Sequence, residues 1–240
     1  LGADKLFRHD WNLTGRDDEL GKLRSFASDP KRKVLFMVAK GGDGKSRLLW
    51  EFCRGLGAEA KIEALCLNPH AHESPTFAFV GPAKQRVVVV DDAHRVELVT
   101  HELLSLIRED KDAKLILAGR PQAQEALAQR LYEHGFQEAD IQIIPLPPLP
   151  KHALGSLAAE ALGPALRQHA AELAKITAES AFFTVIAATL LQQGRLKWGH
   201  WASHQQFRQH VFRACEEENL RSLPEADRLV GSHLLRLLAL

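Results

Sequence analysis

Cysteine is scarce in this sequence, which has 240 residues and only three cysteines. Cys53, Cys66 and Cys215 lie far apart along the chain, and an odd number cannot pair completely. A disulfide framework is therefore excluded as the basis of the fold, and no pair has the spacing of metal ligands. We expect a protein of a reducing compartment, the cytoplasm.

An excess of charge of one sign is also missing. The 31 Lys and Arg residues face 30 Asp and Glu residues, which leaves a formal net charge of +1. This balance argues against a chain that coats nucleic acid or anionic lipid. No apolar run approaches the ~20 residues that a membrane span needs. We therefore expect neither a membrane nor nucleic acid as a partner.

Short apolar runs alternate with helical patterns over the first 150 residues. The runs are continuous, which is typical of strands that are buried on both faces of a parallel sheet. The expected strands are Val34–Val38, Ile62–Leu67, Val87–Val90, Leu115–Ala118 and Ile141–Ile144. The expected helices begin near Asp17 and Lys45 and cover Val96–Ile107 and Gln122–His134. The pattern predicts an α/β domain with helices on both sides of a five-stranded sheet.

Proline marks the end of this domain. Four of the six residues in Pro145–Pro150 are proline, a composition that extends neither a helix nor a sheet. We expect a nucleotide-binding domain over 1–150 and a helical subdomain over 151–222. The last residues, 223–240, form an apolar helical pattern that would begin a further domain. We therefore expect this chain to be part of a longer protein.

A glycine-rich turn lies between the first strand and the following helix. Residues 39–46 read Ala-Lys-Gly-Gly-Asp-Gly-Lys-Ser, which matches the P-loop pattern G-x-x-x-x-G-K-[ST] except at Ala39. Glycine allows the backbone N–H groups to curl around a phosphate, and the helix N-terminus adds positive charge. Ala39 is tolerable there if its φ is negative. The expected phosphate-binding residues are Lys40, Gly41, Gly42, Asp43, Gly44, Lys45, Ser46 and Arg47.

Two carboxylates follow the third expected strand. Ligands of open α/β sheets bind at the carboxyl ends of the strands. Lys45 would reach the β- and γ-phosphates, while Ser46 and Asp91 would hold Mg²⁺. Asp92 would orient or deprotonate the attacking water. The alternative reading of Asp91 and Asp92 is a helix cap.

Arg120 follows the fourth expected strand. A guanidinium at that edge could stabilise or sense a γ-phosphate, so Arg120 joins Lys45, Asp91 and Asp92 as a candidate catalytic residue. The alternative is a solvated arginine before Pro121.

Together these segments resemble the nucleotide-binding core of STAND NTPases, the class of NACHT, NB-ARC and bacterial antiviral proteins. The resemblance rests on the Thr14-Gly15-Arg16 stretch, the P-loop, the two aspartates and Gly119-Arg120. It implies a sheet of order 5-1-4-3-2, ATP or ADP with Mg²⁺ as cofactors, and Gly15 and Arg16 near the adenine.

The resemblance also implies a switch in antiphage or immune signalling. ATP binding would drive self-association into an oligomer, a protein trigger would start it, and effector and sensor domains would lie in the same longer chain. Slow ATP hydrolysis is expected because Asp92 stands where vigorous ATPases carry a glutamate. Two alternatives stay open: a motor or DNA-loader ATPase of the AAA+ type, and a non-catalytic scaffold that keeps ADP.

Overall fold

The computed structural model describes residues 11–58, 62–67, 85–93, 99–177, 180–199 and 203–221. Contacts divide the chain into two compact units. One is Gly15–Pro148, and the other joins residues 11–14 to the chain from Leu149 onward. The sequence predicts a nucleotide-binding domain over 1–150. Residues 11–14 instead pack with the helices, because Trp11 lies against their core and Asn12 bonds Glu160.

The first unit is built on a parallel five-stranded sheet of order β2-β3-β4-β1-β5, as expected. The strands are β1 Val34–Val38, β2 Ile62–Leu67, β3 Gln85–Val90, β4 Ala113–Gly119 and β5 Ile141–Pro145. The α-helices of this unit are α1 Asp17–Ser28, α2 Lys45–Ala58, α3 His101–Glu109 and α4 Gln124–Glu133. Two short 3-10 turns, η3 Pro121–Ala123 and η4 Glu138–Asp140, precede α4 and β5.

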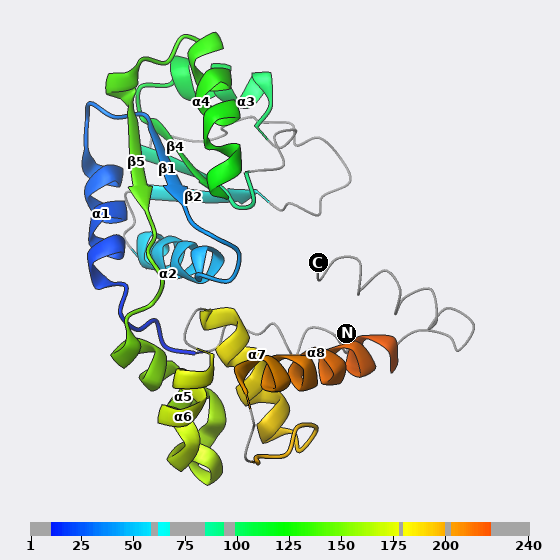
Figure 1. The fold of residues 1–240 in the computed structure, drawn as a ribbon. Helices are drawn as coiled ribbons and strands as arrows, with labels where there is room; N and C mark the ends of the chain where they lie inside the picture. Colours follow the sequence, from blue (N-terminus) through cyan, green and yellow to red (C-terminus); the bar gives the residue numbers. More distant parts are fainter. Residues whose placement is uncertain are drawn as a thin grey trace. The chain divides into compact units, whose positions relative to one another are not determined.

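Helices cover both faces of the sheet. Side chains alternate along a strand, so Val34 and Phe36 of β1 join α3 and α4 in one apolar cluster. Their neighbours Leu35 and Met37 are equally buried and point to the opposite face. Figure 1 shows α1 and α2 together on that opposite side, and these two helices contact each other. The continuous apolar runs of the sequence arise from this double coverage.

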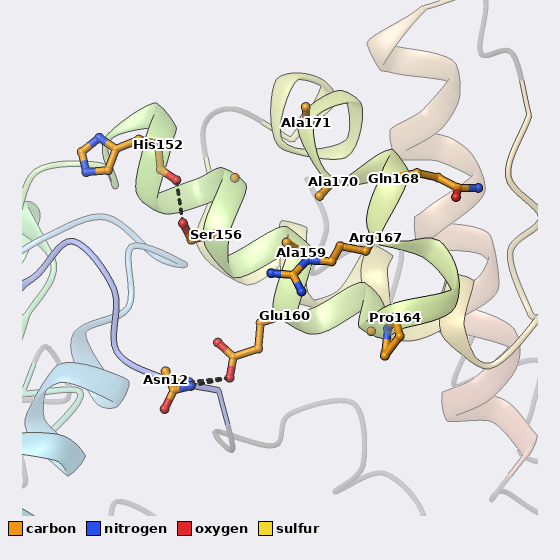
Figure 2. A pocket seen from close by; sticks show the side chains of 12 residues that line it. Asn12, His152, Ser156, Ala159, Glu160, Pro164, Arg167, Gln168, Ala170 and Ala171 are labelled. Atoms are coloured by element: carbon orange, nitrogen blue, oxygen red, sulfur yellow. Dashed lines mark hydrogen bonds between the residues drawn. The ribbon is translucent and has the colours of Figure 1, made fainter.

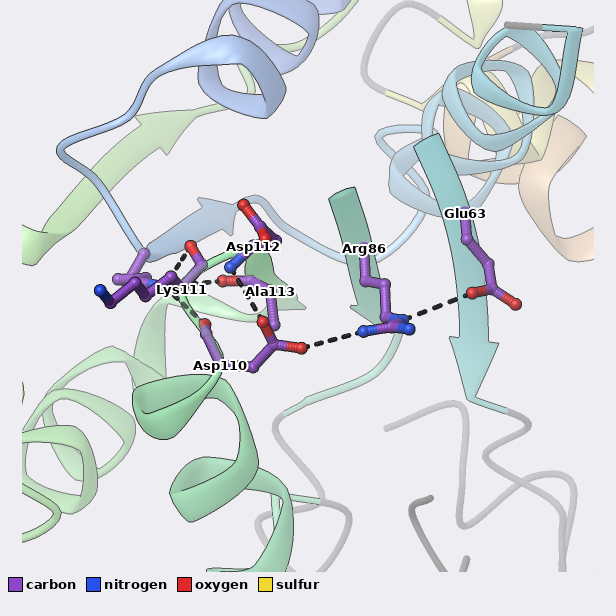
Figure 3. A network of polar contacts seen from close by, with 7 residues as sticks. Glu63, Arg86, Asp110, Lys111, Asp112 and Ala113 are labelled. Atoms are coloured by element: carbon purple, nitrogen blue, oxygen red, sulfur yellow. Dashed lines mark hydrogen bonds and ion pairs between the residues drawn. The ribbon is translucent and has the colours of Figure 1, made fainter. Parts of the chain in front are cut away.

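Basic side chains secure the amino ends of the strands. Lys33 donates from Nζ to the carbonyl oxygens of Asp110 and Lys111, both at 2.7 Å, and of Ala113 at 3.3 Å. Buried Arg86 contacts Asp110 at 3.0 Å and Glu63 at 3.5 Å (Figure 3). This network joins the starts of β1, β2, β3 and β4. Its side chains lie at the amino ends of the strands, away from the carboxyl ends.

The second unit is helical, as expected for residues 151–222. Its helices are α5 Lys151–Leu166, η5 Arg167–His169, α6 Ala170–Ile176, α7 Ala181–Gln192 and α8 His204–Arg221. Helix α5 is kinked at Gly163, which has a φ of 68°. Pro164 is the next residue. Leu157, Leu190 and Phe207 lie in one shared core. The expected start of a further domain at 223–240 lies outside the described residues.

Among the described helices, none combines the length and the apolar character that a bilayer crossing requires.

Candidate nucleotide-binding site

Three strands end at one edge of the sheet and carry the predicted site residues there. Val38 of β1 pairs with Gly119 of β4, and Val90 of β3 pairs with Leu117. The loops that follow are joined as well, because the Ala39 N–H donates to the Gly119 carbonyl oxygen at 3.2 Å. The segments that carry Lys45, Asp91 and Arg120 therefore emerge side by side.

The glycine-rich turn has the backbone that the motif requires. Gly42 and Gly44 have φ values of 87° and 90°, which glycine adopts without steric strain. Ala39 lies outside the left-handed region, so the departure from the motif costs nothing in backbone strain. The buried carboxylate of Asp43 accepts a hydrogen bond from the Lys40 N–H at 3.1 Å. Asp43 thus closes the turn on itself.

Lys45 begins α2 and is buried in the centre of the site. Its Nζ donates to the carbonyl oxygens of Ala39 at 3.0 Å and of Lys40 at 2.8 Å. Burial lowers the pKa of Lys45, while the negative charges of Asp91, Asp43 and Asp92 oppose that shift. These carboxylates are therefore close enough to act on the Lys45 ammonium, and that mutual influence links the two motifs in space.

Asp91 and Asp92 follow β3 and are both half-buried. The Asp92 N–H donates to Oδ1 of Asp91 at 2.9 Å, which fixes the Asp91 carboxylate. Asp92 has a φ of 51°, the one positive value of a non-glycine residue in the described part of the chain. Strained backbone of this kind is common where a side chain must point in a functional direction.

The donor set suits magnesium. The Ser46 hydroxyl is exposed, and Asp91 supplies a carboxylate; both are oxygen ligands of the kind that Mg²⁺ prefers. No group of three or more His, Cys, Asp or Glu side chains in the described segments could hold a metal by itself. Mg²⁺ commonly takes few protein ligands and completes its shell with phosphate and water, so the residues present fit that ion.

Arg120 lies over the phosphate loop. Its Nη2 atom is 3.9 Å from the place where a β-carbon on Gly41 would stand. The guanidinium is exposed, and its charge adds to burial in lowering the pKa of Lys45. Two cationic side chains, one at the start of α2 and one just after β4, therefore flank the same turn, an arrangement that suits a polyphosphate.

Arg16 is buried against the phosphate loop, and its expected place near the adenine stays a prediction. It is 3 % exposed, and its Nη2 donates to the Asp43 carbonyl oxygen at 2.9 Å. Nη1 lies 3.5 Å from the Glu19 carboxylate. Burial lowers the pKa of Arg16, and the charges of Glu19 and Asp43 oppose this. Arg16, which follows Gly15 with its φ of 64°, therefore supports the phosphate loop from within.

Two residues of the predicted phosphate-binding loop, Lys40 and Arg47, have polar groups that bond to other residues of the protein. The Arg47 side chain pairs with Glu51 at 2.8 Å and lies over the Trp50 ring along α2. The Lys40 N–H is occupied by Asp43. The interpretation of the sequence also missed Glu19, the partner of Arg16. The spacing Arg16-x-x-Glu19 at a helix start is a signal that could have found it.

A pocket with a volume of about 770 Å³ lies within the helical unit. Asn12, His152, Ser156, Glu160 and Arg167 are among the residues that line it (Figure 2). Glu160 accepts hydrogen bonds from the Asn12 side chain at 2.9 Å and from its backbone N–H at 3.1 Å. Ser156 donates to the His152 carbonyl oxygen at 3.2 Å. These contacts hold the polar lining in place and show no arrangement for catalysis.

The fold is that of P-loop NTPases. A protein family described as "AAA domain" matches residues 12–127. A comparison with curated protein sequences gave no match. The narrower resemblance to STAND proteins therefore stays a prediction.

Several solved structures share this fold. A Walker-type ATPase of Pyrococcus abyssi is 12% identical, with a TM-score of 0.54. The match covers 90% of this chain and 76% of the ATPase chain. Aeropyrum pernix Orc1 in complex with DNA is 16% identical with a TM-score of 0.56, at 91% and 71% coverage. Domain III of Thermotoga maritima DnaA, a replication initiation protein, is 15% identical with a TM-score of 0.53, at 87% and 96% coverage. The chain thus has the fold of AAA-type P-loop ATPases.

Proposed function

We propose that this chain is an ATP-binding and slowly hydrolysing ATPase module of the AAA type. The observation that supports this most directly is the joint position of Lys45, Asp91, Asp92 and Arg120 around one turn. Asp92 directly follows Asp91 in the chain, so we assign Asp91 to the metal and Asp92 to the attacking water. The short side chain of Asp92 supports low turnover.

The proposed reaction is attack of water on the γ-phosphorus of ATP. Asp92 accepts the proton of the water, and the bond to the β–γ bridging oxygen breaks to release ADP and phosphate. Lys45 and Arg120 stabilise the negative charge that develops on the phosphate oxygens. When bound, Mg²⁺ held by Ser46 and Asp91 supplies further charge stabilisation. Glycine N–H groups of the loop and the start of α2 orient the phosphates.

The test compares nucleotide binding and phosphate release in wild type, Lys45→Ala and Lys22→Ala. Lys22 is an exposed lysine of α1 and is the matched control. We expect wild type and Lys22→Ala to bind ATP and release phosphate, and Lys45→Ala to lose both. ATP and GTP are measured side by side, because neither the motif nor the fold distinguishes the bases. Binding that is indifferent to Lys45→Ala would exclude this site.

A nucleotide-controlled switch that self-associates is the second candidate. Its support is Asp92, a shorter carboxylate than the glutamate of vigorous ATPases. On this proposal ATP gives a larger assembly than ADP in light scattering, and assembly survives in an Asp92→Asn variant that cannot hydrolyse ATP. A loader-type ATPase would instead bind DNA, with an affinity that falls steeply as salt rises. The two outcomes separate the switch from the loader.

A further inference from the structure

Two cysteines that are distant in sequence meet in the fold. The Sγ atoms of Cys53 on α2 and Cys66 on β2 lie 3.2 Å apart. They meet because α2 packs against β2 and because side chains alternate along the strand. Leu65 contacts the cluster under α3 and α4, so its neighbour Cys66 points to the opposite face, where α2 lies. Neither cysteine takes part in the ATPase site proposed above.

The two thiols differ in access. Cys66 is exposed, whereas Cys53 is half-buried. The hydrogen bond between the two thiols lowers the pKa of Cys66 to about 7, although burial and the charge of Asp91 oppose this shift. The same hydrogen bond, with burial, raises the pKa of Cys53. Cys66 is thus the exposed thiolate that attacks first, and Cys53 is the neighbour that can resolve the product.

We propose that Cys53 and Cys66 form an oxidisable dithiol that takes a hydroperoxide as its oxidant and closes to an intramolecular disulfide between α2 and β2. The Cys66 thiolate attacks the terminal peroxide oxygen, the O–O bond breaks, and a sulfenic acid forms with release of water or an alcohol. The Cys53 sulfur then attacks the Cys66 sulfur, the S–O bond breaks, and the departing hydroxide leaves as water with the Cys53 proton. Two electrons pass from the two thiols to the peroxide.

The position of the pair gives the modification a structural consequence. Helix α2 begins with Lys45, and β2 lies beside β3, which carries Asp91 at its end. A disulfide would therefore join the helix of the phosphate loop to the edge strand of the sheet. No third metal-ligating side chain accompanies the pair in the described segments, so a dithiol fits the geometry better than a metal site.

The test oxidises the reduced full chain with hydrogen peroxide and maps the products by peptide mass spectrometry. We expect a Cys53–Cys66 linked peptide in wild type and in Cys215→Ser, the matched control that keeps both members of the pair. Its rate should not depend on protein concentration, since closure is intramolecular. In Cys53→Ser, a sulfenic acid should persist on Cys66 and be trapped by dimedone.

Unfolded protein serves as the second control. In denaturant, oxidation should scatter among all three pairings, whereas the folded chain should give Cys53–Cys66 alone. At pH 7, Cys66 in Cys53→Ser should consume peroxide about tenfold faster than Cys53 in Cys66→Ser, because its thiolate fraction is larger. Disulfides only between molecules, or oxidation of the folded chain that is no more selective than that of the unfolded chain, would overturn the proposal.

Discussion

Arg16 donates a hydrogen bond from Nη2 to the carbonyl oxygen of Asp43 at 2.9 Å and so joins the start of α1 to the phosphate loop. The Asp43 side chain in turn accepts from the Lys40 N–H. The turn is therefore held on both sides by contacts within the protein. A loop that is fixed before the nucleotide arrives loses less conformational entropy when it binds.

Replacing Arg16 should weaken the fold and the nucleotide site together. Arg16→Ala leaves the Asp43 carbonyl oxygen and the Glu19 carboxylate without their buried partner, which we expect to cost about 2–3 kcal/mol of unfolding free energy. Urea denaturation measures that loss, and nucleotide titration measures the weaker binding. Arg24→Ala, an exposed arginine of the same helix, is the control and should match wild type. Equal stability of the two variants would contradict the supporting role of Arg16.

Asp92→Asn should separate binding from hydrolysis. Asparagine tolerates the left-handed backbone that the φ of 51° requires, so the fold should be preserved. The amide cannot accept the proton of the attacking water, and we expect phosphate release to fall about a hundredfold or more. ATP affinity should stay close to wild type. If single-turnover phosphate release in Asp92→Asn matched wild type, another group would have to activate the water.

Arg120→Ala should distinguish ATP from ADP. The guanidinium lies over Gly41 at the edge of the sheet, where we place the γ-phosphate. Loss of a charge-assisted hydrogen bond should weaken ATP binding about tenfold or more and leave ADP binding within about twofold. Calorimetric titration with each nucleotide measures the difference. Arg54→Ala on the exposed face of α2 is the control, and an equal effect on ATP and ADP would place Arg120 away from the γ-phosphate.

Lys33→Met should destabilise the sheet without touching nucleotide binding. Methionine keeps the length of the side chain but leaves three carbonyl oxygens without their donor. We expect a loss of about 1–3 kcal/mol in urea denaturation, with an unchanged dissociation constant for ATP in the folded protein. Lys111→Met, an exposed lysine nearby, should have no effect on stability. A change in ATP affinity would show that the two edges of the sheet are coupled.

The reactivity of Cys66 should depend on pH near neutrality. Its pKa is lowered to about 7, so the thiolate persists above that pH and is lost below it. Alkylation of Cys66 by iodoacetamide, followed by mass spectrometry, should therefore rise with a midpoint near pH 7. Cys53→Ala removes the hydrogen-bond partner of Cys66 and should move the midpoint upward, toward the ~8.5 of a free cysteine. Identical midpoints in the two proteins would contradict this role of Cys53.

Much of the sheet could be predicted from the sequence, because continuous apolar runs have few alternatives. The bounds of β1 and β2 match the prediction, and the predicted strand order is confirmed. β3 and β4 begin earlier than expected because the second residue of each, Arg86 or Lys114, is a basic residue that is buried against polar partners. Counting apolar residues cannot detect such a strand end.

Other parts of the prediction failed for similar reasons. The predicted helix Gln122–His134 instead begins with a 3-10 turn and ends at Glu133, and β5 includes Pro145 at the sheet edge, where a missing N–H is tolerated. The start of the predicted helix Val96–Ile107 lies outside the described residues, and α3 runs from His101 to Glu109. The approach of Cys53 to Cys66 depends on tertiary packing, which no local pattern encodes.

The network of Lys33, Arg86 and Asp110 lies at the amino ends of the strands, whereas the candidate nucleotide site lies at their carboxyl ends. The network's hydrogen bonds and ion pairs gather where the strands start, away from the loops that carry Lys45, Asp91 and Arg120. Those loops can therefore diverge in length and composition as ligands change, while the scaffold beneath them stays intact. This arrangement permits sequence variation in the loops at the carboxyl ends of the strands while the residues at the amino ends stay constant.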